Sequence, residues 1–377
     1  MFLNNLILIG KFSFILFLLV CTILNGCTGE TESSERINYN DEIKDSSAPL
    51  NKIKEDELGN EFPLINYTLD TIKSREHLKS ILTKYRRTES NLKQHKIFIT
   101  LNRKELRFLG VGSAYITPDT IVDDIRAYSV FPQYYSGGID IPKIILISNI
   151  YQCYACYEYG KLVRFAAANT GKERTPSFPG RYALNWKVRL HRSSLDSNWV
   201  MPFTWNFHTE AGSAFHQFVM PGRPASHSCI RQFLDDSEWL FYWGEGIKRD
   251  SLGKLIPLSG TPVIIIDHYD FSEGKGKQWL RLKNNKEKVL KLPENPMEVE
   301  EALIPIIQIP EMSRGSLRNK IRYIYAEDTL RARGVIRDGV KLIPSVNFNQ
   351  LRREKAARQE KLKRAKELQE ERKDSLQ

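Results

Sequence analysis

A cysteine flanked by basic side chains is the part of the sequence with the clearest potential for chemistry. It stands in "PASHSCIRQF", residues 224–233, where His227 precedes Cys229 by two positions and Arg231 follows it by two. A cysteine is a nucleophile as the thiolate, and neighbouring cationic groups lower the pKa of a thiol. The alternative is a small buried apolar residue with incidental charged neighbours.

Two upstream histidines are candidates for the general base. His216 lies thirteen positions before Cys229, and the Pro221-Gly222 turn between them can fold the chain back so that the imidazole reaches the sulfur. A Cys–His pair within hydrogen-bond reach is the arrangement that a thiol nucleophile needs. His208, in "WNFHTEAG", has a longer gap to the cysteine and is the alternative base.

The backbone around the cysteine is a candidate for a further role. Ser228 and Cys229 stand just before a predicted helix, so their N–H groups are candidates to hold an oxyanion. The helix is predicted from "LDDSEWLFYWGEG", where Asp235 and Glu238 form a capping-box pattern and Trp239, Leu240 and Trp243 supply an apolar face.

Short apolar runs separated by turn residues place the cysteine in a β-rich domain. The run "KIILISNIYQCYACYEYGKLVRFAAANTG" indicates three consecutive strands, and more strands are indicated by "GRYALNWKVRL", "WVMPFTWNF", "SAFHQFVM" and "GTPVIIID". Helical periodicity appears in the flanks, in "SREHLKSILTKYRR" before this block and in several segments after residue 271.

The first residues indicate export. "MFLNNLILIGKFSFILFLLVCTILNGC" has an apolar run over residues 12–24, shorter than the ~20 residues that span a bilayer and typical of a signal peptide. Its ending "LNGC" resembles a bacterial lipobox, which implies lipidation of Cys27 and anchoring to a membrane. An ordinary signal peptide or an uncleaved anchor is the alternative. Residues 28–60 are polar and charged, as expected of a flexible tether.

Composition narrows the class of partner. A hydrophobic content of 41% and an aromatic content of 11% are typical of a globular protein. The net charge of +11 suits an anionic polymer of the cell envelope as well as nucleic acid. Because the chain carries an export signal, we expect no nucleic-acid partner.

The sequence around Cys229 resembles the motif S/T-H-G-C-I/V-R of L,D-transpeptidases of the YkuD type, the cysteine enzymes of peptidoglycan. The resemblance extends to "LISNIYQCYACYEYGKLVRFAAANTGKERTPSFPGRYAL", to "WVMPFTWNF", to "AFHQFVMPGRPASHS" and to "GTPVIII", in the order expected for that family. It covers roughly residues 142–268, about a third of the chain.

The resemblance implies a role for each residue of the motif. Cys229 would attack the diaminopimelate-type residue of a tetrapeptide stem, releasing D-alanine and leaving a thioester. His216 would be general base and then acid, and His227 would position the loop. The N–H of Ser228 would help hold the oxyanion. Arg231, Met201 and Arg223 would contact the substrate.

One residue departs from the family motif, because Ser228 stands where the family has glycine. If the backbone there needs a positive φ, serine costs about 1 kcal/mol relative to glycine. We expect this to affect rate or substrate choice more than the fold.

Two further cysteines, Cys153 and Cys156, form "CYAC". In a strand they are ~10 Å apart and face opposite ways, whereas a disulfide needs Cα atoms closer than ~7 Å. No second Cys/His pair at zinc spacing accompanies them. We therefore predict two packed strand residues, no metal and no cofactor.

The expected fold is mostly β: a YkuD-like β-sandwich with one helix after the cysteine loop, between a small mixed α/β N-terminal domain and a helical C-terminal region. The predicted boundaries are 1–27 for the signal peptide with Cys27, 28–60 for the tether, 61–138 for the N-terminal domain, 139–271 for the catalytic domain and 272–377 for a charged extension. Within the N-terminal domain, "LNRKELRFLGVGSAYITP" resembles the end of a glycan-binding LysM repeat; a capping domain without a ligand is the alternative.

The resulting hypothesis is an envelope lipoprotein facing the periplasm that cross-links peptidoglycan stem peptides. Hydrolysis of the same bond, as in a carboxypeptidase or amidase, is one alternative, since water can replace the acceptor amine. A non-catalytic peptidoglycan-binding lipoprotein is the other.

Overall fold

The computed structural model describes residues 62–272, 277–287 and 290–374. The predicted signal peptide, Cys27 and the tether at 28–60 lie outside these residues. In the described part of the chain, no helix is both long enough and apolar enough to cross a membrane.

A five-stranded sheet forms the centre of the fold, in the spatial order β5-β4-β3-β11-β6. Its strands are β3 (Ile144–Ser148), β4 (Cys153–Glu158), β5 (Lys161–Ala167), β6 (Gly180–Ala183) and β11 (Pro262–Ile265). The first three form a meander, as their consecutive apolar runs predict. The last strand, β11, lies parallel to β3 and antiparallel to β6, so it is inserted between them and β6 forms the edge of the sheet.

A four-stranded sheet carries the cysteine region, in the order β10-β9-β8-β7. Its strands are β7 (Lys187–Arg192), β8 (Val200–His208), β9 (Ser213–Gln217) and β10 (Ile230–Gln232). The short β10 pairs parallel to β9, and it begins at the residue after Cys229.

The strand alternation of side chains divides the core into two layers. Ile145 and Ile147 of β3 pack between the two sheets, together with Phe215 and Ile230 from the four-stranded sheet. Ile144 and Leu146 face the other way, into a second core. The predicted mostly β architecture of two packed sheets is confirmed.

The cysteines of "CYAC" follow the same alternation. Cys156 packs between the sheets and Cys153 packs into the second core, and both are free and buried. The prediction of two packed strand residues is confirmed.

The loop of residues 218–229, which joins β9 to β10 and carries Cys229, is named here the cysteine loop. The helix α4 (Leu234–Trp243) follows this loop and β10, as predicted. Its N-cap is Phe233 without a side-chain hydrogen bond, so the predicted capping box is wrong: Asp235 lies inside the first turn. The helix is instead joined to β5 by a buried ion pair, in which Arg164 Nη2 lies 2.5 Å from Asp236 Oδ1. Burial lowers the pKa of the Arg164 guanidinium, but the Asp236 charge raises it by more, so the net shift is upward; burial also raises the pKa of Asp236, against the charge of Arg164.

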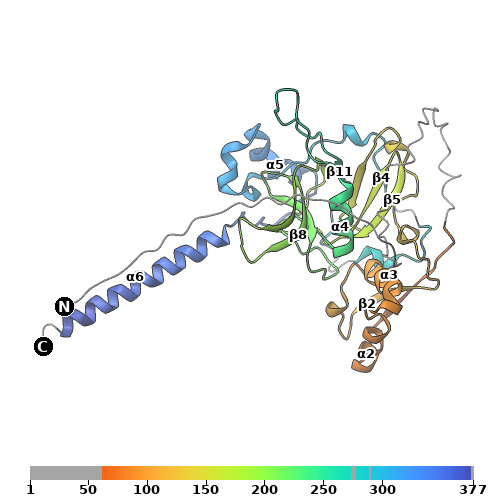
Figure 1. Ribbon diagram of the computed structural model, residues 1–377, viewed down its shortest axis with the longest axis horizontal. Helices are drawn as coiled ribbons and strands as arrows, with labels where there is room; N and C mark the ends of the chain where they lie inside the picture. Colours follow the sequence, from red (N-terminus) through yellow and green to blue (C-terminus); the bar gives the residue numbers. More distant parts are fainter. Residues whose placement is uncertain (1–61, 273–276, 288–289, 375–377) are drawn as a thin grey trace, which may run out of the picture. The chain divides into compact units, whose positions relative to one another are not determined.

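The segment before the sheets contains β1 (Tyr67–Thr71), α2 (Arg75–Lys84), α3 (Leu92–Asn102) and β2 (Ala114–Pro118), with β1 and β2 paired antiparallel. Helix α3 lies against β5 (Figure 1). Ile97 and Leu101 of this helix enter the second core, so the segment covers the outer face of the five-stranded sheet. The likeness to a LysM repeat stays a prediction.

The chain after the sheets returns to both cores. Trp279 and Leu282 belong to the second core, and Ile304 and Ile309 belong to the core between the sheets. Two α-helices follow, α5 (Lys320–Ala332) and α6 (Phe348–Asp374). Single-turn 3-10 helices in the described residues lie at Glu89–Asn91, Leu106–Phe108, Ile125–Tyr128, Ser136–Gly138, Gln278–Arg281, Pro296–Glu298, Ile306–Gln308 and Glu311–Ser316.

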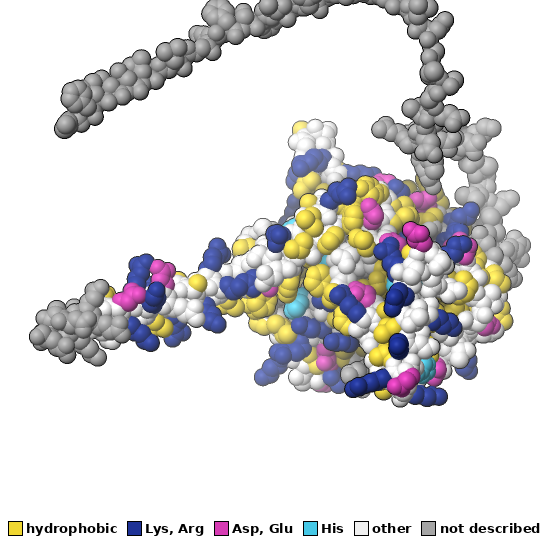
Figure 2. Space-filling view, turned by 60° about the horizontal axis from the view of Figure 1, so that its bottom comes forward, with side chains coloured by type: hydrophobic (Ala, Val, Ile, Leu, Met, Phe, Trp, Pro, Cys, Tyr) yellow, Lys and Arg dark blue, Asp and Glu magenta, His cyan; other side chains and the backbone are white. Residues whose placement is uncertain are grey.

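The helix α6 is exposed along its described side chains after its first two residues, Phe348 and Asn349, which are half-buried. It carries dark blue Lys and Arg side chains interspersed with magenta acidic ones (Figure 2). Two ion pairs between residues four positions apart, Lys363–Glu367 and Arg364–Glu360, lie on its surface. The charged end of the described chain is therefore a helix whose surface is mostly in contact with solvent.

Candidate active site

Strand register brings the predicted nucleophile and the predicted base to one face of the four-stranded sheet. Arg231 is the partner of His216, and Ile230 is the partner of Phe215. Because Phe215 and Ile230 point into the core, the side chains of Cys229 and His216 face the opposite side. Both line a cavity of about 270 Å³, named here the cysteine cavity.

His216 is poised as a neutral base. Its Nδ1 lies 3.0 Å from the carbonyl oxygen of Gln217. A carbonyl only accepts, so Nδ1 carries the proton and Nε2 keeps its lone pair. Burial lowers the pKa of His216 to about 4, and only 4% of the residue is exposed. At neutral pH the imidazole is uncharged.

The thiol of Cys229 is protonated in the same state. Its S–H donates to the carbonyl oxygen of Gly212 across 3.8 Å. Packing around the sulfur raises the thiol pKa, against the lowering effects of the Ala214 N–H and the Arg231 charge. The resting pair is therefore thiol and imidazole, and a thiolate forms when His216 takes the proton.

Ser228 has the positive φ that its place in the motif requires, +76°. Its hydroxyl lies 2.8 Å from the Ser213 hydroxyl, which compensates part of the strain. Its carbonyl accepts from the Ser177 hydroxyl across 2.9 Å. Ser228 is thus held on the side chain and on the backbone.

The predicted oxyanion role of Ser228 needs correction. Its N–H already donates to the carbonyl of Thr175 across 3.1 Å, so this donor is engaged. Within the residues that the structure describes, the N–H of Cys229 has no such acceptor. Cys229 is therefore the better of the two candidate amides.

His227 is exposed and lies on the rim, where it lines the cysteine cavity and a second one. Its Nε2 lies 3.2 Å from Lys172 Nζ, and its ring lies 5.0 Å from the ring of Trp199. Because an ammonium only donates, Nε2 accepts and Nδ1 carries the proton. Although the residue as a whole is exposed, partial desolvation of its ring and the charges of Lys172 and Arg231 lower the pKa of His227.

His208 lies elsewhere. Its Nδ1 accepts from the N–H of Ala211 at 3.1 Å, and its ring contacts the rings of Tyr182 and Tyr323. It is absent from the lining of the cysteine cavity. The structure therefore brings His216, and not His208, into the same cavity as Cys229.

Two of the three predicted substrate-contacting residues lie at the cysteine cavity. Met201 and Arg231 line the cysteine cavity. The Arg231 guanidinium stacks on the ring of Phe218 and donates to the carbonyl of Val219, which fixes its place. Arg223 is exposed and does not line the cavity, so the structure does not bring it to the site.

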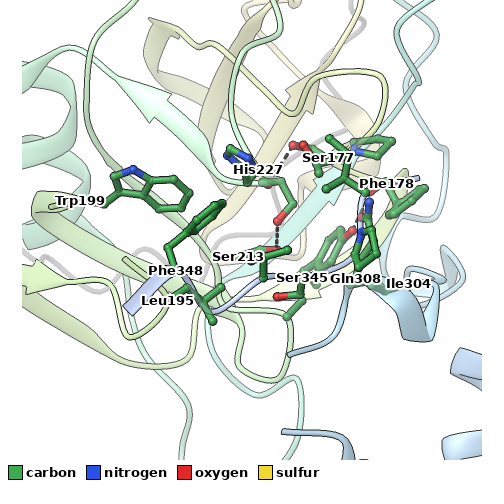
Figure 3. Close-up of a pocket in the computed structure, with 18 residues that line it drawn as sticks. Ser177, Phe178, Leu195, Trp199, Ser213, His227, Ile304, Gln308, Ser345 and Phe348 are labelled. Carbon is green, nitrogen blue, oxygen red and sulfur yellow. Dashed lines mark hydrogen bonds between the residues drawn. The ribbon is translucent and has the colours of Figure 1, made fainter. Parts of the chain in front are cut away.

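The second cavity, of about 70 Å³, lies beside Ser228 and is named here the strap cavity. Much of its lining comes from the C-terminal strap, residues 304–352. Figure 3 shows Trp199, Phe348 and Leu195 at one end of it and Ile304, Gln308 and Phe178 at the other. Ser213 and His227 lie between the two ends (Figure 3).

Sequence reasoning missed several residues of the site. Thr175 and Ser177 hold the cysteine loop, and Lys172 contacts His227. All three stand in "TGKERTPS", which belongs to the stretch that carries the family resemblance but for which no roles were predicted. Trp199 stands in "WVMPFTWNF", which the family resemblance includes, but no role was expected of its side chain. The strap carries no local signal. No cluster of three or more metal-ligating side chains occurs in the part of the chain that the structure describes.

Comparison with known families decides the class of the domain. Residues 142–265 match the family model of YkuD, the L,D-transpeptidase catalytic domain. The matched segment, about a third of the chain, comprises both sheets, the cysteine loop and α4.

Solved structures with similarity to the YkuD domain are L,D-transpeptidases. One from Stackebrandtia nassauensis is 19% identical, with 34% of this chain and 58% of that chain covered and a TM-score of 0.28. One from Xylanimonas cellulosilytica is 27% identical, with 33% and 59% covered and a TM-score of 0.25. L,D-transpeptidase 1 of Mycobacterium tuberculosis is 18% identical, with 33% and 60% covered and a TM-score of 0.25. The chain therefore spans less than two thirds of each of these structures. No protein with a curated description matches it.

Proposed function

We propose that the protein is a peptidoglycan L,D-transpeptidase that works through a thioester on Cys229. The observation that carries the proposal is the shared cavity of Cys229 and His216, with His216 Nδ1 fixed by the Gln217 carbonyl. A nucleophile, a neutral base and a group that orients the base are the parts that acyl transfer requires. The YkuD family match supports the same class of reaction.

The first half-reaction follows from the protonation states. Nε2 of His216 takes the thiol proton, and the sulfur attacks the carbonyl carbon of the penultimate residue of a tetrapeptide stem. The N–H of Cys229 stabilises the developing oxyanion. The C–N bond to D-alanine then breaks, and the imidazolium returns its proton to the leaving amine.

In the second half-reaction, an acceptor amine takes the place that the D-alanine amine left. An acceptor amine attacks the thioester and passes a proton to His216. The C–S bond breaks, the sulfur recovers the proton from His216, and a new amide remains. Arg231, half-buried at the cavity wall beside the Phe218 ring, suits a substrate carboxylate.

Digestion of isolated sacculi after incubation with the protein tests this reaction. The expected products are cross-linked muropeptides joined through the penultimate residue, together with free D-alanine. Tripeptide stems without new cross-links identify the protein as a hydrolase instead. Unchanged muropeptides contradict both reactions and leave a peptidoglycan-binding protein.

We also propose that Cys27 carries a lipid that anchors the chain at the envelope membrane, facing the periplasm. Support comes from the "LNGC" sequence after the apolar run. Labelling cells with a radioactive fatty acid tests it: label on the wild-type protein and none on Cys27→Ala is expected. Equal labelling of both, or none of either, contradicts the anchor.

A further inference from the structure

One loop walls both cavities. It joins β7 to β8 over residues 193–199 and is named here the Trp199 loop. Leu195 and Trp199 line the cysteine cavity and the strap cavity alike, and Ser193 and Ser194 line the cysteine cavity as well. The position of this loop therefore sets the width of the space in front of Cys229.

The Trp199 loop is tied to the first turn of α6 by Asn349. The backbone N–H of Asn349 donates to the Leu195 carbonyl at 3.0 Å, and its side-chain amide donates to the Ser194 carbonyl at 3.0 Å. Its side-chain oxygen accepts from the N–H of Ser197 at 2.9 Å. One residue thus satisfies three backbone groups of the loop.

An ion pair adds to this contact. Arg352 Nη2 lies 2.5 Å from Asp196 Oδ1 and 2.9 Å from Asn349 Oδ1. Asp196 is 8% exposed, so its carboxylate is largely shielded from water. The hydrogen bond from Arg352 lowers the pKa of Asp196, which keeps the carboxylate charged.

The contact continues from the loop to the catalytic motif. The ring of Trp199 lies 5.9 Å from that of Phe348, at the start of α6, and 5.0 Å from that of His227. His227 precedes Cys229 by two residues. A chain of packed rings therefore joins α6 to the edge of the cysteine loop.

The strap holds the other side of the cysteine loop as well. Arg174 Nε donates to the carbonyl of Lys341, and the Arg174 carbonyl accepts from Gln308 and from the N–H of Ile343. The neighbouring Thr175 and Ser177 bind the backbone of the cysteine loop. Both loops beside the nucleophile are thus fixed by residues from the end of the chain.

We propose that Asn349 and Arg352 are positioning residues for the reaction, holding the Trp199 loop in place so that the cavity fits its substrate. This rests on the proposed transpeptidase function. His216 stands on β9 and Cys229 directly precedes β10, and among the residues that the structure describes none from α6 lines the cysteine cavity. The hydrogen bonds and ion pair that Asn349 and Arg352 make with the Trp199 loop are named here the latch. Loss of the latch therefore weakens substrate binding and leaves the reactivity of the Cys229 thiol unchanged.

The test compares Asn349→Ala and Arg352→Ala with Arg364→Ala, which removes an exposed ion pair farther along α6. For D-alanine release from a tetrapeptide stem, KM should rise about tenfold in Asn349→Ala, because a tenfold change corresponds to the loss of one or two hydrogen bonds. The value of kcat should stay within about twofold of wild type. Arg352→Lys should recover part of the loss, and Arg364→Ala should match wild type. Alkylation of Cys229 by iodoacetamide should proceed at the wild-type rate in all variants.

Two results overturn the proposal. An unchanged KM in both latch variants shows that the loop needs no latch. A fall in alkylation rate parallel to the fall in activity shows that the mutations damage the cysteine loop itself.

Amide hydrogen exchange separates failure of the latch from failure of the proposed function. Residues 193–199 should exchange faster in Asn349→Ala than in wild type and Arg364→Ala. If the wild-type protein releases no D-alanine, the transpeptidase proposal fails and the substrate role falls with it, while faster exchange still supports the latch. Unchanged exchange contradicts the latch whatever the activity.

Discussion

The cysteine cavity and the strap cavity share a wall, formed by the Trp199 loop and His227, but they are built in different ways. In the cysteine cavity, His216 stands on β9 and Cys229 directly precedes β10, and the pairing of these two strands fixes which way both side chains face. The strap cavity is enclosed by loops and by residues from the end of the chain, and it is about a quarter of the size, about 70 Å³ against about 270 Å³.

This difference separates reactivity from fit. The strand pair sets the distance and the protonation of the reacting groups through rigid backbone. The loops and the strap set what can approach those groups. A change on the strand side should therefore alter the chemical step, and a change on the strap side should alter binding.

The largest effect is expected from loss of His216, with His208 as the matched control. His216→Ala should slow acylation of Cys229 by an activated acyl donor about 10²–10⁴-fold, because the thiol loses its base. His208→Ala removes a histidine of similar burial that does not line the cavity, so acylation should stay within a few-fold of wild type. Stopped-flow measurement of the acylation rate distinguishes them, and a reversed order would make His208 the base.

Ion pairs give the next contrast, in stability. Asp236→Ala leaves Arg164 buried without its partner and should cost about 3–5 kcal/mol of the free energy of unfolding. Arg337→Ala breaks an exposed pair with Glu173 on the strap side and should cost at most about 1 kcal/mol. Urea unfolding of the two variants measures both values. Equal losses would show that the strap contributes as much stability as the sheets.

Acylation should depend on pH through His216. Its imidazole must be neutral to act as a base, and its pKa is lowered to about 4, so the rate should rise as pH increases through about 4 and stay level near neutrality. In His216→Ala the thiol must ionise unaided, and its raised pKa moves the residual rate into the alkaline range. A wild-type rate that climbs steadily through neutral pH contradicts a neutral resting pair.

The same histidines link stability to pH. Burial lowers the pKa of His208 and of His216 from about 6.5 in an unfolded chain to about 4. The unfolded chain binds more protons between these values, so the free energy of unfolding falls as pH falls from about 6.5 to about 4, by on the order of 3 kcal/mol for each histidine. His208→Gln should remove one of the two contributions in urea unfolding at pH 7 and pH 4.5. A pH dependence identical to wild type refutes its burial as a neutral group.

The smallest effect is expected at Ser228. Ser228→Gly relieves about 1 kcal/mol of backbone strain and loses a hydrogen bond to Ser213 of similar size, so stability should change by less than about 0.5 kcal/mol. Ser228→Ala keeps the strain and loses the bond, and should cost about 1 kcal/mol. Urea unfolding of the pair measures the balance. A large gain for the glycine variant would mean that Ser213 compensates little.

The sequence predicts the strand-built half of the molecule well. Alternating apolar runs indicate the strands, the spacing of His216 and Cys229 brackets a turn, and the order of the motifs indicates the family whose model matches residues 142–265. The opposite facing of Cys153 and Cys156 follows from strand period alone.

The loop-built half could not be predicted in the same way. The contacts of Asn349 and Arg352 span more than 150 residues of sequence, and local periodicity carries no information about such pairs. The engagement of the Ser228 N–H by Thr175 depends on a loop that returns from the five-stranded sheet. The resemblance implies a substrate contact for Arg223, which follows the Pro221-Gly222 turn, but the side chain is exposed and does not line the cysteine cavity.

Intact-protein mass spectrometry after incubation with a carbapenem, used as the acyl donor, tests the central claim most directly. The account predicts one adduct that maps to Cys229, absent from Cys229→Ala, formed far more slowly by His216→Ala and at nearly the wild-type rate by His208→Ala. The chain has five cysteines, so the site of the adduct is informative. No adduct, or an adduct that persists in Cys229→Ala, contradicts the assignment of Cys229 as the nucleophile.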